Sequence, residues 1–234
     1  MNCVYDILIE FGFHRFSNHH SEPFVVHCVP GAGKSTAIRK ILSCLPEARA
    51  YTFGVCDPPS VCTCRIQGVR EWDQATSTEF TIVDEYTEGD YIKLQPKLVF
   101  GDPCQSEHLS RVLRPHYTCL TTKRFGAETC AILRKLKFQI FSEKCDTVLQ
   151  VGIFEGEPEG QVVAFEDEVK TLLNSHNCEY KGLCEIRGET YKCVTFVTAT
   201  VGVPKQDIEK FFLCLTRHSE KLVILSPDAA FASC

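Results

Sequence analysis

The sequence predicts an α/β fold with mainly parallel sheets. A β-rich apolar run, "FVVHCV" (24–29), is followed by a glycine-rich turn and then by a stretch with one apolar helical face. Further short apolar runs recur along the chain and end in acidic or turn-forming residues. Strands that recur with crossovers between them are typical of a parallel sheet, which binds its ligands at the carboxyl ends of the strands.

The first half of the chain contains four predicted strands and two predicted helices. Residues 4–11 and 36–45 carry apolar side chains at helical spacing, so each predicts an amphipathic helix. The run at 24–29, bounded by Pro23 and Pro30, predicts a buried strand. Three more strands are predicted at the apolar runs 50–55, 80–85 and 97–102.

The second half begins after a segment, 114–126, that we interpret as a join. We therefore expect two domains, 1–115 and 116–234, which the chain length allows. A helix is predicted directly after the join. Within the acid-rich stretch 145–169, the "EGEPEG" part is expected to be an exposed loop. Strands of a second, smaller sheet are predicted at 162–165, 194–199 and 221–225.

Composition excludes several classes of protein. The chain has 234 residues, 44% of them hydrophobic, which is enough for a sizeable core. The net charge of −5 means that any nucleic acid must be bound by locally placed Lys and Arg side chains. No apolar run approaches the roughly 18 residues of a membrane span, so none is expected.

Fifteen cysteines are scattered through apolar runs, and their odd number does not suit a disulfide framework. We interpret them as reduced, buried thiols of a cytosolic protein. Cys56, Cys62 and Cys64 lie close in sequence but lack the second ligand pair of a zinc site, so they too are interpreted as structural.

The turn "VPGAGKST" has the pattern of a phosphate-binding loop. Glycines let successive N–H groups point at phosphate oxygens, and the following helix adds its positive end. Lys34 would reach the β- and γ-phosphates of ATP, and Ser35 would bind Mg²⁺. Cys28 stands where the usual pattern has its first glycine, and we expect a small side chain to be tolerated at this strand end. The nucleotide-binding residues are predicted to be Pro30, Gly31, Ala32, Gly33, Lys34, Ser35 and Thr36.

Two later strand ends carry polar groups suited to hydrolysis. In "TIVDEY", Asp84 is predicted to hold Mg²⁺ and Glu85 to orient and deprotonate an attacking water. In "LVFGDPCQ", Gln105 is predicted to contact the γ-phosphate or that water. The alternative is that the carboxylates simply end a strand at the surface, but the upstream loop favours a nucleotide site.

Two arginines of the second half are further candidates. Arg124 lies in "TTKRFG" and Arg217 in "LTRH". An arginine that faces the γ-phosphate from a second domain would stabilise charge in the transition state. The alternative for each is an ordinary surface arginine.

In this order, the motifs "VPGAGKS", "TIVDEY", "LVFGDPCQ", "TTKRFG", "GETYKCVTFVTA" and "LTRH" resemble those of the superfamily 1 RNA helicases of positive-strand RNA viruses. More closely, the chain resembles the first triple gene block proteins of plant viruses of the potexvirus and carlavirus kind, from about Tyr5 to Leu225. The resemblance implies two RecA-like P-loop NTPase domains with ATP and Mg²⁺ bound between them.

The same resemblance implies a role in the plant cell. Family members hydrolyse NTPs, bind single-stranded RNA and aid the cell-to-cell transport of viral RNA through plasmodesmata, and some suppress RNA silencing. Expected partners are the viral genome, the viral coat protein, two small triple gene block membrane proteins and further copies of the chain. The expected location is the host cell cytoplasm, including plasmodesmata.

Two other functions remain open from the sequence. One is an RNA-binding and assembly protein whose NTPase activity is incidental. The other is a small P-loop kinase, against which the Gly-Asp-Pro-x-Gln element and the late arginine argue, because a kinase has no need of them.

Overall fold

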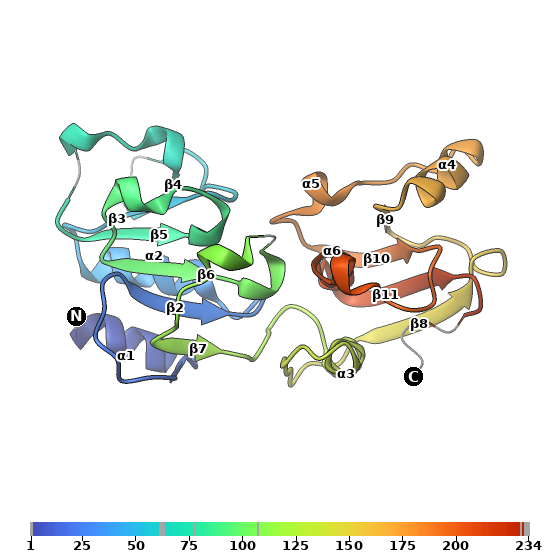
Figure 1. Cartoon of the computed structure of the whole chain (residues 1–234), viewed down its shortest axis with the longest axis horizontal. Coiled ribbons are helices and arrows are strands. Elements are labelled where there is room, and N and C mark those ends of the chain that lie inside the picture. Colours follow the sequence, from blue (N-terminus) through green and yellow to red (C-terminus); the bar gives the residue numbers. More distant parts are fainter. Residues whose placement is uncertain (1, 61–63, 77, 107, 230, 232–234) are drawn as a thin grey trace. The chain divides into compact units, whose positions relative to one another are not determined.

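The computed structural model describes residues 2–60, 64–76, 78–106, 108–229 and 231 (Figure 1). The chain divides into two compact units, Met1–Thr121 and Thr122–Cys234. The expected division came after residue 115, and the structural one comes later because strand β7 (Tyr117–Cys119) completes the first sheet. Among the described residues, no helix is long and apolar enough to cross a membrane.

Unit 1 contains a seven-stranded sheet in the order β1-β7-β2-β6-β5-β3-β4. All neighbouring strands are parallel except β1 and β7, which are antiparallel. The other strands are β1 (His14–Arg15), β2 (Phe24–Cys28), β3 (Arg49–Thr52), β4 (Ile66–Gly68), β5 (Thr81–Asp84) and β6 (Leu98–Gly101).

The order of these strands determines where the candidate residues meet. β2 lies between β6 and β7, and β5 is the next strand beyond β6. Because the four strands are parallel, the segments that follow β2, β5 and β6 leave the sheet at the same carboxyl edge. β2 is buried along most of its length, which explains its continuous apolar run.

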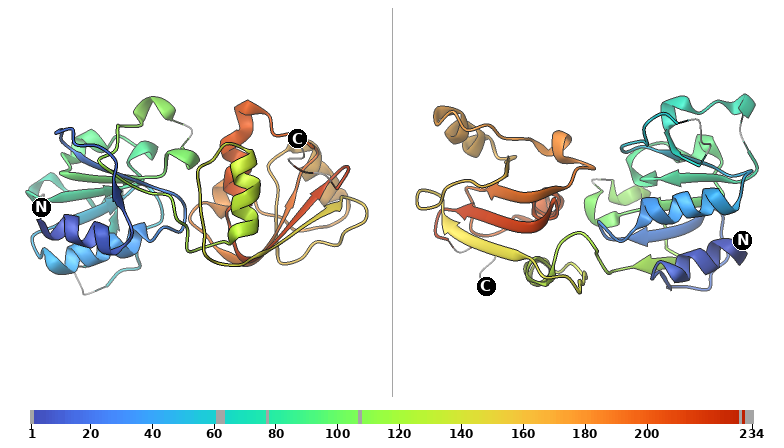
Figure 2. Two further views of the ribbon diagram at one scale, coloured as in Figure 1. Left: turned by 90° about the horizontal axis from the view of Figure 1, so that it is seen from below. Right: turned by 180° about the vertical axis from the view of Figure 1, so that it is seen from behind.

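Two helices of unit 1, α1 (Asn2–Glu10) and α2 (Lys34–Cys44), lie on the same side of the sheet and contact each other (Figure 2). α2 buries Ala37, Ile38, Ile41 and Leu42, the apolar face that the sequence predicts. Short 3₁₀ turns make up most of the remaining connections: Val69–Glu71, Gln74–Thr76, Tyr86–Glu88, Tyr91–Leu94, Pro103–Gln105 and Leu109–Arg111.

Unit 2 contains a four-stranded, all-parallel sheet in the order β8-β11-β10-β9. Its core includes Val162, Val197, Val223 and Leu225 from the strands, with Leu173 from a helix. The strands are β8 (Thr147–Gly152), β9 (Gln161–Val163), β10 (Tyr191–Val197) and β11 (His218–Ser226). The helices are α3 (Ala127–Lys135), α4 (Asp167–Ser175), α5 (Leu183–Ile186) and α6 (Ile208–Leu215), with a 3₁₀ turn at Lys205–Asp207.

The prediction of a mixed α/β fold with parallel sheets is confirmed, but it missed several elements. β4 and β7 are three residues long, too short to produce an apolar run. β8 lies inside the acid-rich stretch, and as an edge strand it keeps much of its surface exposed, so its sequence is not continuously apolar. The "EGEPEG" segment that follows β8 is largely exposed, as predicted.

Candidate functional site

The segment Pro30–Thr36 forms the turn from β2 into α2. Gly31 and Gly33 have φ values of 74° and 96°, a conformation that glycine adopts without strain. Gly33 is the N-cap of α2, and no side chain caps this end of the helix. The first N–H groups of a helix have no partner within the helix, and the positive end of its dipole lies there. The turn therefore offers donors to an anion.

Cys28, at the position of the missing glycine, is the last residue of β2. It pairs with Cys119 of β7, its φ is not positive, and its side chain is buried. Burial raises the pKa of the Cys28 thiol well above its usual value, so the sulfur stays protonated. The strand thus accommodates a small side chain here, as the sequence analysis expected.

Lys34 lies beside both members of the acidic pair. Its Nζ is 2.7 Å from Oδ1 of Asp84 and also donates to Oε1 of Glu85. Burial disfavours the charged amine, but the charges of Asp84 and Glu85 outweigh that effect and raise the pKa of Lys34. The structure therefore brings together a cation from the turn after β2 and two carboxylates from the end of β5.

Glu85 has an uncommon backbone conformation. Its φ of 52° and ψ of 43° are left-handed, which costs a residue with a side chain about 1–2 kcal/mol. The N–H of Glu85 donates to Oδ1 of Asp84 at 2.9 Å. The Glu85 side chain also packs close to the backbone of Gly54, where an added Cβ would lie only 3.2 Å from Cγ of Glu85. Residues held in such conformations cluster at functional sites, where the surrounding structure imposes them.

Asp102 is a site residue that the sequence analysis missed. It follows β6, the strand between β2 and β5, and is 3% exposed. Its Oδ1 accepts from the N–H of Cys104 at 3.0 Å, and its Oδ2 accepts from the side-chain amide of Gln105. Burial raises the pKa of Asp102 to about 6, and the charge of Glu85 adds to the effect. The sequence does contain a signal for Asp102, because this acidic residue ends the apolar run at 97–102, which contains β6, the strand beside β2.

This raised pKa predicts how stability depends on pH. Between the unfolded and folded pKa values the native state binds more protons, so the contribution of Asp102 to the stability of unit 1 falls as pH rises through about 6. An Asp102→Asn variant does not titrate there. Its stability relative to wild type should increase by about 1–2 kcal/mol from pH 5 to pH 8.

The single tryptophan, Trp72, lies in unit 1, so its fluorescence during denaturant unfolding of nucleotide-free protein measures this difference. A difference between the two proteins that stays constant from pH 5 to pH 8 would contradict the assignment of a raised pKa to Asp102.

Arg124 and Arg217 both lie in unit 2, close to Thr216. Nη1 of Arg124 donates to the carbonyl of Thr216 at 3.3 Å. Arg217 is 1% exposed, and its guanidinium donates to the carbonyl of Leu213 at 3.2 Å and to Oγ1 of Thr216 at 3.0 Å. The "TTKRFG" and "LTRH" motifs therefore meet in one place, although 92 residues separate Arg124 from Thr216.

A buried polar network includes His218, the residue that follows Arg217. Oδ2 of Asp146 accepts from Thr129 at 2.6 Å and is 3.1 Å from Nε2 of His218. Burial opposes ionisation of Asp146, but hydrogen bonds from His218 and Thr129 lower its pKa to about 2. A Cβ on Gly126 would lie 2.4 Å from the backbone nitrogen of Asp146, so only glycine fits. The network joins the start of α3 to the start of β11.

Ser35 and Asp84 are the residues that would hold Mg²⁺. A hydroxyl and a carboxylate are the oxygen ligands that Mg²⁺ prefers, so these residues fit the ion. In the described part of the chain, no three His, Cys, Asp or Glu side chains are grouped to hold a metal. Cys44, Cys56, Cys145 and Cys184 are exposed, so the expectation of buried thiols is wrong for these four. Cys64 is half-buried, and Cys62 lies outside the described residues.

Two hollows of about 900 and 760 Å³ lie elsewhere on unit 1. Their walls include Glu22, Glu79 and Lys97, which precede β2, β5 and β6. They are thus at the amino edge of the sheet, opposite the turn after β2. Neither hollow is lined by Lys34, Asp84 or Glu85.

Comparison with known proteins adds family relationships. The profile of the viral superfamily 1 RNA helicase core domain matches residues 24–226. The chain is 44% identical over 232 residues to the movement and silencing protein TGBp1 of Poplar mosaic virus, with 99% of each chain covered. It is 39% identical over 233 residues to the protein of the same name from Lily symptomless virus, with 100% of each covered.

Among solved structures, the fold is similar to that of arterivirus nonstructural protein 10, a helicase, with a TM-score of 0.57 and 18% identity. This match covers 97% of the chain and spans 56% of the helicase. A complex of that helicase with DNA matches with a TM-score of 0.56 and 19% identity, covering 97% of the chain and 57% of the helicase. At these identities the likeness is one of fold.

Proposed function

This chain belongs to the TGBp1 family of viral superfamily 1 helicase-like movement proteins, and we propose that it is an Mg²⁺-dependent ATPase that uses hydrolysis to change its hold on single-stranded RNA. One observation carries the proposal. Lys34, at the uncapped start of α2, contacts the carboxylates of both Asp84 and Glu85. Lys34, the proposed phosphate-binding cation, thus contacts both Asp84, the proposed metal ligand, and Glu85, the proposed general base.

Nucleotide binding is assigned to the turn after β2. The N–H groups of Pro30–Thr36 other than the proline would surround the phosphates of ATP, and Lys34 would leave the carboxylates to contact the β- and γ-phosphates. Ser35 and Asp84 would hold Mg²⁺, which supplies positive charge to the phosphate oxygens when it is bound.

Hydrolysis is assigned to the groups around that turn. Glu85, once Lys34 turns to phosphate, has a carboxylate free to orient water and accept its proton. The amide of Gln105, held by Asp102, would contact the γ-phosphate or the attacking water. Arg124 and Arg217 are proposed to contribute positive charge to the transition state.

An Arg217→Ala variant tests the role of the second unit. We expect kcat to fall about a hundredfold while the Kd for Mg–ATP changes little, because the charge is needed mainly in the transition state. Steady-state ATPase kinetics with a separate nucleotide-binding assay measure the two effects. Arg217 is buried, so thermal unfolding of the variant must show a folded protein. Equal losses of kcat and ATP affinity would contradict this role.

RNA binding is assigned to the carboxyl edges of the two sheets. We propose that the two units, Met1–Thr121 and Thr122–Cys234, are two RecA-like domains, and the parallel sheet in each unit supports this. RNA would be held mostly through its backbone with some base stacking, and so with little sequence specificity. Because the chain has a net charge of −5, affinity must depend on local cations and fall steeply with salt.

The biological role follows from the names of the relatives. We propose that the chain moves viral RNA from cell to cell through plasmodesmata and suppresses RNA silencing in the host cytoplasm. It would act with the viral coat protein, the two small triple gene block membrane proteins and further copies of itself.

The affinity for a labelled single-stranded RNA, measured with a non-hydrolysable ATP analogue and with ADP, tests the coupling of nucleotide to RNA. We expect the two affinities to differ, and more strongly at low salt. Equal affinities would favour an assembly protein with incidental NTPase activity, as would a virus carrying Lys34→Ala that still moves between cells. Stimulation of ADP formation by a small metabolite, and not by RNA, would favour a kinase.

A further inference from the structure

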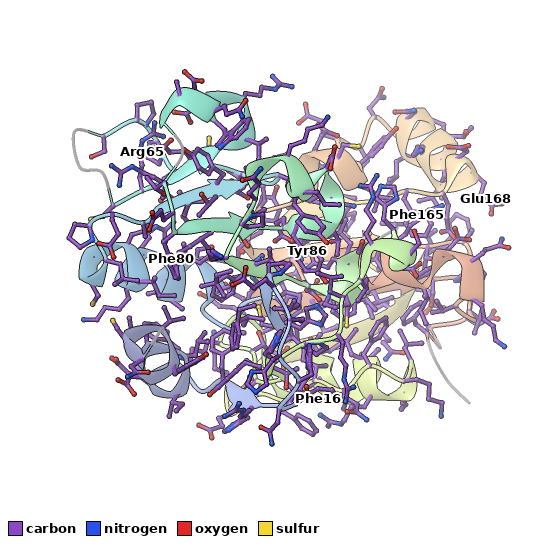
Figure 3. All side chains as sticks on the ribbon, turned by 60° about the vertical axis from the view of Figure 1, so that its left-hand side comes forward. Phe16, Arg65, Phe80, Tyr86, Phe165 and Glu168 are labelled. Atoms are coloured by element: carbon purple, nitrogen blue, oxygen red, sulfur yellow. The ribbon has the colours of Figure 1, made fainter. Side chains whose placement is uncertain are left out.

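Tyr86, which follows the acidic pair, belongs to a buried core cluster of unit 1 and is labelled in Figure 3. It is 0% exposed, and the proposed mechanism gives it no role. Its hydroxyl oxygen is 2.8 Å from the backbone nitrogen of Leu113 and 2.8 Å from Nε2 of His27. One hydroxyl thus joins β2, the strand before the phosphate-binding turn, to the segment that precedes β7.

The direction of these two hydrogen bonds can be assigned. The N–H of Leu113 can only donate, so the tyrosine oxygen accepts it. The tyrosine O–H then needs an acceptor, and among the described residues Nε2 of His27 is its partner. Burial lowers the pKa of His27 to about 4, so the imidazole is neutral and Nε2 can accept. The chain of donors runs from Leu113 through Tyr86 to His27.

The ring of Tyr86 is fixed by a second contact. A Cβ on Gly101 would lie 2.7 Å from Cε1 of Tyr86, so the ring packs directly against the backbone at the end of β6. Asp102 and Gln105 follow that glycine. The ring also packs edge-on against Tyr91, with centroids 5.3 Å apart. Tyr86 therefore contacts β2, which leads into the phosphate-binding turn, and the end of β6, which leads to Asp102 and Gln105.

These contacts bear on the residue before Tyr86. Glu85 is left-handed, a conformation that persists only where the surrounding structure imposes it. On one side it is joined to Asp84, at the end of β5. On the other side is Tyr86, whose ring and hydroxyl are both fixed. Freedom at Tyr86 would let the turn relax and move the Glu85 carboxylate away from Lys34.

We propose that Tyr86 and His27 are positioning residues that hold the Glu85 carboxylate in place for hydrolysis through the hydrogen bond between them. The inference rests on the proposed ATPase function. It assigns no contact with nucleotide to either residue. Loss of the bond should therefore lower kcat and leave nucleotide binding, which depends on the turn after β2, unchanged.

The test is a double-mutant cycle on kcat with separate measurement of the Kd for Mg–ATP. Tyr86→Phe keeps the ring and removes the hydroxyl, and His27→Leu removes the acceptor. We expect each to lower kcat about tenfold and to change Kd less than about twofold, because a small misplacement of a catalytic group affects mainly the chemical step. The double variant should lose no more than either single variant, because both changes remove one bond.

Two further variants separate positioning from a general loss of packing. His27→Gln places an amide oxygen where Nε2 lies and should restore most of the lost kcat. Tyr91→Phe, which alters a ring packed against Tyr86 but takes no part in the donor chain, should match wild type. Overturning results are a Tyr86→Phe kcat within about twofold of wild type, additive losses in the double variant, or a rise in Kd that parallels the loss of kcat.

Hydrogen exchange of the amides of residues 84–88 gives a readout that does not need hydrolysis. Exchange should become faster in Tyr86→Phe and His27→Leu but not in His27→Gln or Tyr91→Phe. If the wild-type protein hydrolyses no ATP, the proposed function fails, and this pattern still decides the positioning role. Unchanged exchange in Tyr86→Phe overturns it.

Discussion

Replacing Lys34 by alanine should lower RNA-stimulated phosphate release about a thousandfold or more, to the background of the assay. The change removes the cation that the structure places at the start of α2, in contact with Asp84 and Glu85. Without it, the phosphates lose their charged partner in both the ground state and the transition state. Steady-state release of phosphate from Mg–ATP with saturating single-stranded RNA measures the effect.

A matched control for this variant is Lys93→Ala. Lys93 is 76% exposed and pairs with Asp90 in a 3₁₀ turn away from the phosphate-binding turn, so its loss should leave hydrolysis unchanged. Trp72 fluorescence and thermal unfolding should show that Lys34→Ala is folded. Hydrolysis by folded Lys34→Ala at more than a few per cent of the wild-type rate would remove this turn as the ATPase site.

Glu85→Gln should lower kcat about a thousandfold while ATP binding is kept. The amide cannot accept a proton from water, but it leaves the turn and Lys34 in place. Because Lys34 also loses one of its two carboxylate partners, the phosphates meet less competition for the amine. Single-turnover hydrolysis and equilibrium binding of Mg–ATP measure the two quantities separately.

Glu88→Gln is the matched control for the loss of kcat expected in Glu85→Gln. Glu88 lies in the same turn, where its carboxylate accepts from the hydroxyl of Thr87 at 3.3 Å, and we assign it no chemical role. It should keep nearly full activity. A Glu85→Gln variant that retains more than about a tenth of wild-type kcat would show that another group accepts the proton.

The sequence was enough to predict the elements that are buried on both sides. β2, β5 and β6 are buried along almost their whole length, so each produced an apolar run that ends at a turn. β8 was missed because, as an edge strand, it keeps exposed residues and lies within the acid-rich stretch 145–169, although its own segment, "TVLQVG", contains no acidic residue. β7 lies inside the segment interpreted as a join. It is only three residues long, and it pairs with β2, which lies far away in the sequence, so no local pattern reveals it.

The candidate site was predictable where its chemistry is local. Lys34, Ser35 and the glycines form one motif, and Asp84 and Glu85 are adjacent in sequence. Asp102 was overlooked because its importance depends on β6 lying between β2 and β5, which sequence order does not show. The hydrogen bond from Tyr86 to His27 joins residues 59 apart, so it too required the structure.

The most direct test of the central claim is the rate of phosphate release from Mg–ATP by the wild-type chain, with and without single-stranded RNA, beside Lys34→Ala. We predict that RNA raises the wild-type rate and that Lys34→Ala stays at background in both conditions. A wild-type rate that equals that of folded Lys34→Ala in the presence of RNA would contradict the claim that this chain couples ATP hydrolysis to RNA.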